Sequence, residues 1–185
     1  ESLRQPREDG VIRVARAERT LSFPARFMLV ASQNPCPCGF ASDPEHACVC
    51  TPTQLTKYQK KLSGPLLDRI DLHIEVPRLS FTALTGHETG ETSADVRLRV
   101  VMARERQQRR FKGSTITANS EMRIQDLKIF CALDEVTMQM LRLATERYQL
   151  SARAYSRLIK VSRTIADLAD SDTIKQEHMA EALQF

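Results

Sequence analysis

Apolar and polar residues alternate in the N-terminal part of the chain, as they do in β-strands. Residues 11–22 (VIRVARAERTLS) alternate on both sides of a short turn and predict a β-hairpin. The apolar run 26–31 is rich in large side chains and predicts a buried strand, which ends at Asn34-Pro35. Residues 71–76 alternate again and predict a further strand that Pro77 ends.

The pattern changes to a helical one in the second half of the chain. Apolar residues recur there every three or four positions, which predicts amphipathic helices over 94–111, 124–132, 134–149, 151–169 and 173–184. Two shorter helical stretches are expected earlier, over 53–61 and 66–69. The polar, glycine-containing residues 85–93 are interpreted as a linker. The sequence therefore predicts an α/β part over residues 1–90, followed by an all-α part over residues 91–185.

Composition narrows the class of protein only slightly. The 185 residues are 42% hydrophobic and 27% charged, which is ordinary for a domain with a core. No run of 18 apolar residues and no signal peptide occur, so we expect a cytoplasmic protein without a membrane partner. The chain begins at Glu1 rather than Met, and we expect it to be a piece of something longer.

A basic stripe lies between residues 97 and 112. The net charge of the chain is only +4, but seven Lys or Arg residues fall within the stripe and Glu105 is the one acidic residue among them. Such a stripe could face phosphates. A solvated helix face is the alternative.

Four of the five cysteines form two close pairs, Cys36-Pro-Cys38 and Cys48-Val-Cys50. Without a secretion signal, disulfides are the poorer explanation. Two pairs joined by a short loop can wrap one zinc ion, with His46 as a possible replacement ligand. Four protein ligands leave no open position for water, so the predicted zinc role is structural. The alternative is reduced thiols or a redox pair, whereas Cys131 is interpreted as a core residue.

Long stretches of the chain resemble the ComM/YifB family of magnesium-chelatase-like AAA+ proteins. The resemblance lies in residues 3–10 (LRQPREDG), 23–39 (FPARFMLVASQNPCPCG), 62–77 (LSGPLLDRIDLHIEVP) and 150–168 (LSARAYSRLIKVSRTIADL). It implies the distal part of an AAA+ core with a hairpin insert and a zinc knuckle, followed by a helical lid. It also implies an ATP-driven hexamer that acts on DNA in recombination or transformation.

The resemblance implies three nucleotide-site residues. Asn34 matches the sensor-one residue, Arg69 the arginine finger that reaches a neighbouring subunit, and Arg153 the sensor-two arginine of the lid. An arginine supplied across an interface offsets negative charge during phosphoryl transfer. Arg153 would follow a Ser151 cap, and a bound phosphate at this helix N-terminus would offset the unfavourable dipole interaction of the cation.

Each of these residues also has a structural interpretation. Asn34 before a proline could be a turn former, and Arg153 could be a solvated helix residue. Arg69 could pair with Asp68 or Asp71 on the surface.

The hairpin resembles the extra hairpin that this clade inserts before the sensor-one strand. In related ring motors, such hairpins face the central pore and touch DNA. Arg13, Arg16 and Arg19 are the candidate DNA contacts, and salt-bridged surface arginines are the alternative.

The P-loop string Gly-x-x-x-x-Gly-Lys-Ser/Thr does not occur in these residues, and neither does an apolar strand that ends in Asp-Glu to hold Mg²⁺. We expect both in the N-terminal remainder of the same protein, so this chain alone should neither bind ATP tightly nor hydrolyse it. A magnesium-chelatase ATPase subunit and a non-enzymatic zinc module that binds nucleic acid through residues 94–112 are the alternative functions.

Overall fold

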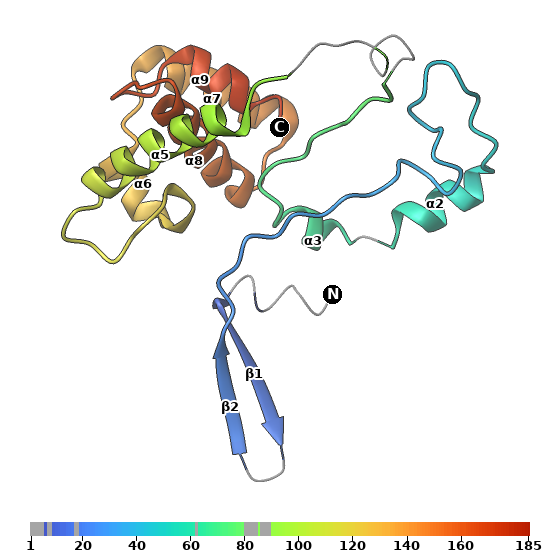
Figure 1. Cartoon of the computed structure of the whole chain (residues 1–185), viewed down its shortest axis with the longest axis horizontal. Coiled ribbons are helices and arrows are strands. Elements are labelled where there is room, and N and C mark those ends of the chain that lie inside the picture. The colour runs from blue at the N-terminus through green and yellow to red at the C-terminus, as the bar shows by residue number, and fades with distance from the viewer. Residues whose placement is uncertain (1–5, 7–8, 17–18, 62, 80–84, 86–89) are drawn as a thin grey trace. The chain divides into compact units, whose positions relative to one another are not determined.

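The chain forms two compact units. The computed structural model describes residues 6, 9–16, 19–61, 63–79, 85 and 90–185 (Figure 1). The first unit comprises Glu1–Leu79 and the second comprises Ser80–Phe185. Part of the predicted linker, residues 86–89, lies outside the described residues.

The predicted β-hairpin is confirmed. Strands β1 (Val11–Arg16) and β2 (Arg19–Pro24) pair antiparallel, with Arg16 opposite Arg19 next to the turn (Figure 1). Ile12 pairs with Phe23 and Val14 with Leu21, so one face of the hairpin is apolar, and these four side chains are 40–53% exposed. Residues 17 and 18 of the turn lie outside the described residues.

The two other predicted strands are wrong. Residues 26–31 and 71–76 run as irregular chain, and most of their apolar side chains are exposed, with Met28 at 88% and Val76 at 83%. A strand exists only through hydrogen bonds to a neighbouring strand. Among the described residues, β1 and β2 pair only with each other, so neither segment has a strand beside it. The apolar pattern is real, but the predicted AAA+ sheet is not formed by these residues.

Two short helices follow the cysteine-rich loop. Helix α2 (Pro52–Gln59) begins at a capping box, in which the Thr51 hydroxyl accepts the Gln54 backbone N–H and the Gln54 side chain accepts the Thr51 N–H. Helix α3 (Gly64–Leu67) is a single turn. Both confirm the predicted helical stretches, and neither contains a buried residue. Burial in the described part of the first unit is confined to Pro6, Ala25 and Cys36.

The second unit is helical, as predicted. Its elements are α5 (Ser93–Arg110), η1 (Asn119–Glu121), α6 (Ile124–Phe130), α7 (Glu135–Tyr148), α8 (Ala152–Leu168) and α9 (Gln176–Ala182). Helix α8 packs against α5, α6, α9 and η1, and α7 packs against α9 (Figure 1). Helix α9 begins later than predicted because Ile174 forms a bridge with Leu133 instead. No helix among the described residues combines the length and the apolar character needed to span a membrane.

A buried carboxylate joins α5 and α8. Asp167 has a side-chain exposure of 0%, and its Oδ2 accepts hydrogen bonds from Arg110 Nη1 and Asn119 Nδ2, both at 2.8 Å. Arg163 Nη2 lies 3.1 Å from Asp167 Oδ1. The backbone N–H of Asn119 donates to Gln107 Oε1 at 3.1 Å. These polar groups therefore bind one another inside a largely apolar core, and Arg163 Nε is the one atom among them that is buried without a hydrogen-bond partner.

The basic stripe is partly neutralised by this arrangement. Arg110 pairs with Asp167, Arg106 pairs with both Asp170 and Asp172, and Arg99 Nη1 lies 2.6 Å from Glu91 Oε1. These three arginines are paired with carboxylates of the same unit, so they fit neither a fully solvated helix face nor a stripe that is free to bind phosphates. The C-terminal end of the stripe holds α5 against the end of α8.

Replacing Asp167 is therefore expected to destabilise the second unit strongly. Asp167→Ala leaves the guanidinium groups of Arg110 and Arg163 in the core without their counter-charge, which should lower the free energy of unfolding by about 3 kcal/mol. Urea denaturation of the chain followed by circular dichroism measures this change. Asp172→Ala is the matched control, because Asp172 is 97% exposed and pairs with Arg106 on the surface, so its loss should cost less than about 1 kcal/mol. Equal losses for both variants would contradict the assignment.

Candidate functional site

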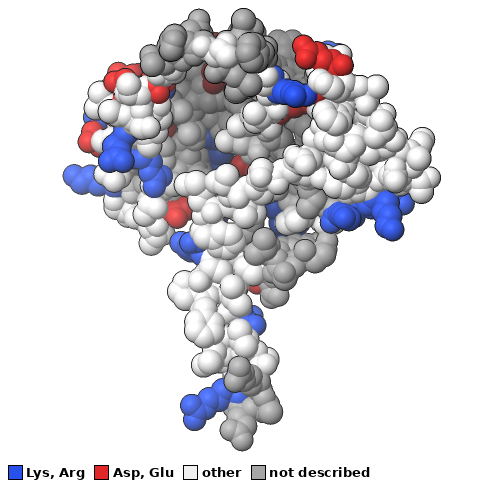
Figure 2. Space-filling model, turned by 45° about the vertical axis from the view of Figure 1, so that its right-hand side comes forward, with Lys and Arg blue, Asp and Glu red and all other residues white. Residues whose placement is uncertain are grey.

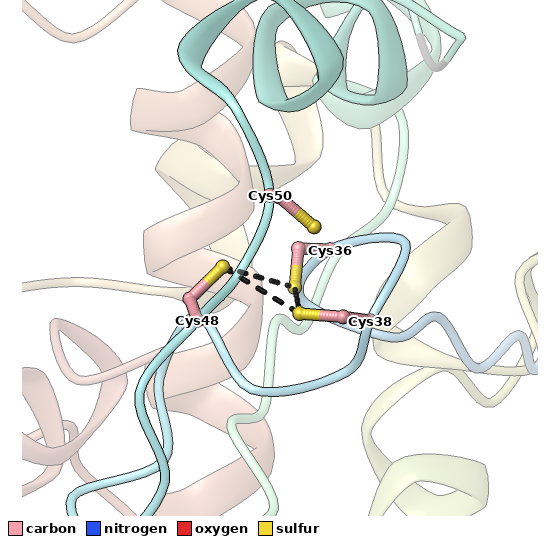
Figure 3. Close-up of side chains that lie close together, drawn as sticks. All are labelled: Cys36, Cys38, Cys48 and Cys50. Atoms are coloured by element: carbon pink, nitrogen blue, oxygen red, sulfur yellow. Dashed lines mark hydrogen bonds between the residues drawn. The ribbon is translucent and has the colours of Figure 1, made fainter.

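The four paired cysteines converge on one point in the first unit. Cys36 Sγ lies 3.3 Å from Cys38 Sγ and 3.7 Å from Cys48 Sγ, and Cys38 Sγ lies 3.6 Å from Cys48 Sγ. All four sulfurs, that of Cys50 included, lie within 4.8 Å of one another (Figure 3). No disulfide joins these cysteines, so all four thiols are available as ligands.

The sulfur positions fit a metal ion. A tetrahedron of thiolates at a Zn–S distance of about 2.3 Å has S···S edges of about 3.8 Å, close to the separations seen here. Four sulfurs complete the coordination and leave no position for a reacting water. The cluster could therefore hold a metal ion in a structural role.

The cluster would exchange protons for the metal. A backbone hydrogen bond from Phe40, helped by the Cys36 sulfur, lowers the pKa of Cys38 to about 6. Burial raises the pKa of Cys50 to about 12. The pKa of Cys48 is also raised, because burial and the neighbouring Cys38 and Cys36 sulfurs outweigh a backbone hydrogen bond from Cys50. Metal binding at neutral pH therefore expels protons from Cys48 and Cys50, since the thiolate is the ligand.

The loop between the two cysteine pairs has its own hydrogen bonds. Gly39 adopts a φ of +85°, a conformation that favours glycine, and its N–H donates to the Cys36 carbonyl at 3.0 Å. Asp43 accepts the backbone N–H groups of Glu45 at 2.8 Å and His46 at 3.1 Å, and the first of these bonds is the main cause that lowers the pKa of Asp43.

His46 is not a member of the sulfur cluster. Its ring stacks on Phe40 at 5.2 Å, and its Nδ1 lies 3.3 Å from both Asp43 Oδ1 and Arg78 Nη1. Among the described residues, the group of ligand atoms close enough to share an ion consists of the four cysteines. The alternative that His46 replaces a cysteine is therefore not supported by the geometry.

Asn34 lies just before the first cysteine pair. It is exposed and sits in irregular chain rather than at the end of a strand. Its carbonyl accepts a hydrogen bond from the Tyr58 hydroxyl of α2 at 3.1 Å. The sequence offers no signal for this contact, because the two residues are 24 positions apart.

Arg69 and Arg153 lie in different units. Arg69 follows α3 and is half-buried, and its Nη1 donates to the Pro65 carbonyl. Arg153 is exposed in the first turn of α8. The predicted Ser151 cap is confirmed, because its hydroxyl accepts the Ala154 N–H at 3.1 Å.

The hairpin arginines fall on two faces. Arg13 pairs with Ser22 and so lies on the face opposite Ile12 and Val14, whereas Arg19 and Arg16 are opposite each other at the turn end. Arg13 and Arg19 are exposed. Figure 2 shows basic side chains on the hairpin among mostly uncharged ones.

Two family descriptions together match nearly the whole chain. The family described as magnesium chelatase, subunit ChlI, matches residues 1–84, and the family described as magnesium chelatase, subunit ChlI C-terminal, matches residues 90–185. The chain belongs to the magnesium-chelatase-like family. This membership implies that the chain is part of an AAA+ protein.

Curated relatives match over the whole chain. It is 43% identical to the competence protein ComM of Haemophilus influenzae, of which it covers 35%. It is 40% identical to YifB of Escherichia coli and 40% identical to the protein Rv2897c of Mycobacterium tuberculosis, and it covers 36% of each. The chain thus spans about a third of the length of these relatives. The predicted resemblance to ComM and YifB is confirmed.

Proposed function

We propose that this chain is the C-terminal part of an ATP-driven AAA+ motor that acts on DNA as a homohexamer. The observation that carries the proposal is the 43% identity with ComM over the whole chain, because that relative is named as a competence protein. Competence is the uptake of DNA, and a branch-migration or helicase-like activity fits that setting. The remaining two thirds of such a protein would supply the P-loop and the Mg²⁺ site.

In this proposal the chain contributes three groups to ATP hydrolysis. The Asn34 amide orients the attacking water or touches the γ-phosphate. Arg69 offsets charge on the nucleotide of a neighbouring subunit, a role for which a planar guanidinium with several donors is suited. Arg153 contacts phosphate from the first turn of α8, where the free N–H groups of the helix also favour an anion. The second unit is then the lid that carries Arg153.

The metal in this proposal is zinc. Four thiolates in a closed tetrahedral arrangement are a typical structural zinc site, and softer donors of this kind are poor ligands for Mg²⁺. Zinc would hold the loop 36–50 in shape in a unit whose described residues bury little apolar surface. We expect about one zinc ion per chain.

The hairpin is the proposed DNA contact. Arg13, Arg16 and Arg19 would face the phosphate backbone, and the exposure of Arg13 and Arg19 supports this. Two exposed arginines give a contact that is weak in one subunit. A ring repeats the contact in every subunit, so the whole assembly gains affinity by multivalency.

The name of the matched families favours a second candidate, the ATPase subunit of a magnesium chelatase. ATPase measurements on the longer protein, which includes the region before residue 1, separate the two functions. We expect hydrolysis to be stimulated by DNA and unaffected by the large subunits of a chelatase. Stimulation by those subunits without any response to DNA would overturn the proposal.

The hairpin offers a sharper arm of the same experiment. The double variant Arg13→Ala/Arg19→Ala should weaken DNA stimulation and reduce the steepness of log affinity against log salt by about two for each subunit that contacts DNA, since about 0.9 is lost for each phosphate contact. Arg142→Ala is the matched control, because Arg142 is 78% exposed in the second unit and pairs with Glu146 on the same helix. The control should leave the salt slope unchanged.

A further inference from the structure

We infer that Tyr58 and the four-cysteine centre together position Asn34, so that the metal acts on ATP hydrolysis through the backbone of this residue. The inference rests on the proposed function, because it gives the metal centre a task at the nucleotide site. It assigns Tyr58 as a positioning residue, which contacts neither nucleotide nor water itself.

Two links join the segment that carries Asn34 to helix α2. Asn34 stands two residues before Cys36, and Cys50 is followed directly by Thr51, the N-cap of α2. Figure 3 shows Cys50 at the start of this helix, with its sulfur directed towards the other three. From α2, the Tyr58 hydroxyl returns to the Asn34 carbonyl at 3.1 Å. A metal held by the four cysteines would be the first link, and the Tyr58 hydrogen bond is the second.

Helix α2 transmits the position of Cys50 to Tyr58. The Thr51–Gln54 capping box fixes the direction in which the helix leaves the cysteine pair. Helix α2 contains no buried residue, and only Leu55 and Tyr58 on it are half-buried, so packing holds it weakly. Its attachment at Cys50 and the hydrogen bond of Tyr58 therefore decide where it lies.

Asn34 depends on this support because its own segment is weakly held. Residues 31–35 are exposed and have no regular structure. A side chain that orients a water must be held to a fraction of an ångström, and a displacement of about 1 Å can cost about 100-fold in rate. Losing either the metal or the Tyr58 hydrogen bond should therefore slow the chemical step more than it weakens nucleotide binding.

Tyr58→Phe in the longer protein tests the inference, because it removes the hydroxyl and keeps the ring. We expect kcat for ATP to fall about three- to tenfold, the effect of losing one hydrogen bond, while KM changes less than about twofold. Zinc content should stay at one per chain. Amide hydrogen exchange over residues 32–38 should become faster. Tyr148→Phe is the matched control, because Tyr148 is 60% exposed on α7, and it should change none of these quantities.

The decisive comparison is whether the effects of losing the metal site and of losing the Tyr58 hydrogen bond depend on each other. Cys50→Ser should lower kcat in the otherwise unchanged protein. Adding Tyr58→Phe to Cys50→Ser should lower kcat little further, because helix α2 has already lost its attachment at the cysteine cluster. Losses that multiply independently would overturn the inference. A lower melting temperature for Tyr58→Phe with an unchanged kcat would also overturn it, since Tyr58 would then be merely structural.

Asn34→Ala distinguishes failure of the inference from failure of the proposed function. If Asn34→Ala lowers kcat and Tyr58→Phe does not, Asn34 keeps its role and the positioning inference is overturned. If Asn34→Ala leaves kcat unchanged, the role proposed for Asn34 is overturned, and the inference with it.

Discussion

If the four cysteines hold zinc as proposed, a strong chelator is expected to unfold the loop 36–50 and to leave the second unit folded. The described part of the first unit buries only Pro6, Ala25 and Cys36, so little apolar burial opposes unfolding there. Structural zinc binding in small domains supplies an apparent free energy of about 10–16 kcal/mol, far more than such burial. Metal analysis, a thiol reagent that counts reactive cysteines and amide hydrogen exchange together measure the loss.

The retention of zinc should also depend on pH. The metal needs thiolates, whereas in the absence of metal the pKa of Cys50 is raised to about 12 and that of Cys48 is raised as well. Protons therefore compete with zinc at these two sulfurs, and lowering the pH strengthens the competition. The apparent zinc affinity should fall as the pH is lowered and rise as it is raised. An affinity that does not change with pH would argue against thiolate ligands.

The fifth cysteine provides the control for the metal experiment. Cys48→Ser removes one ligand and should lower the zinc content and expose the loop. Cys131→Ala changes a buried cysteine of the second unit, whose sulfur lies 3.8 Å from Met122 Sδ. This control should retain one zinc per chain, although it costs some stability in the helical core. Equal zinc loss in both variants would contradict the four-cysteine site.

The helical half of the fold could be predicted because its signals are local. Spacing of apolar residues located the five α-helices of the second unit, and Ser151 before α8 is the N-cap expected from the sequence. The end of α5 differs from prediction by one residue and the start of α9 by three, because tertiary contacts such as the Leu133–Ile174 bridge decide helix ends.

Strands could not be predicted as reliably, because a strand depends on a partner. The hairpin carries its partner strand within a few residues, and it forms. Residues 26–31 and 71–76 have the composition of strands, but among the described residues no strand lies beside them. The local sequence pattern shows which side chains are apolar, but it does not indicate whether a neighbouring strand is present.

The metal ligands of the candidate site could be predicted from the sequence, but the contacts that hold the surrounding residues in place could not. Paired cysteines at short spacing identify a metal cluster because both pairs must bring thiols to one ion. The contact of Tyr58 with Asn34 joins residues far apart in sequence and leaves no periodic signal. The same holds for Asp167, whose partners Arg110 and Asn119 come from other elements. A carboxylate inside an apolar helix face was the available clue, and only packing shows that it is buried.

Arg69→Ala in the longer protein is expected to abolish ATP hydrolysis. If Arg69 is the finger that offsets charge in the transition state, its loss should lower kcat about 10³- to 10⁵-fold, since that is the contribution of such arginines in other phosphoryl-transfer enzymes. Folding should be preserved, because Arg69 is half-buried after α3 and is not part of a core. Steady-state ATPase rates, zinc content and circular dichroism give the three readouts. Lys57→Ala, which removes an exposed cation from α2, is the matched control and should stay within about twofold of the unaltered protein.

Mixing two inactive variants decides whether Arg69 acts on a neighbouring subunit. One variant carries Arg69→Ala and an intact P-loop, and the other keeps Arg69 and lacks the P-loop lysine. If the arginine acts across the interface, mixed rings contain sites that combine an intact P-loop with an intact finger, and part of the activity returns. If Arg69 acts within its own subunit, no site in a mixed ring is complete and the mixture stays inactive. Full activity of Arg69→Ala alone would remove the finger assignment, because a group that stabilises transition-state charge cannot be dispensable.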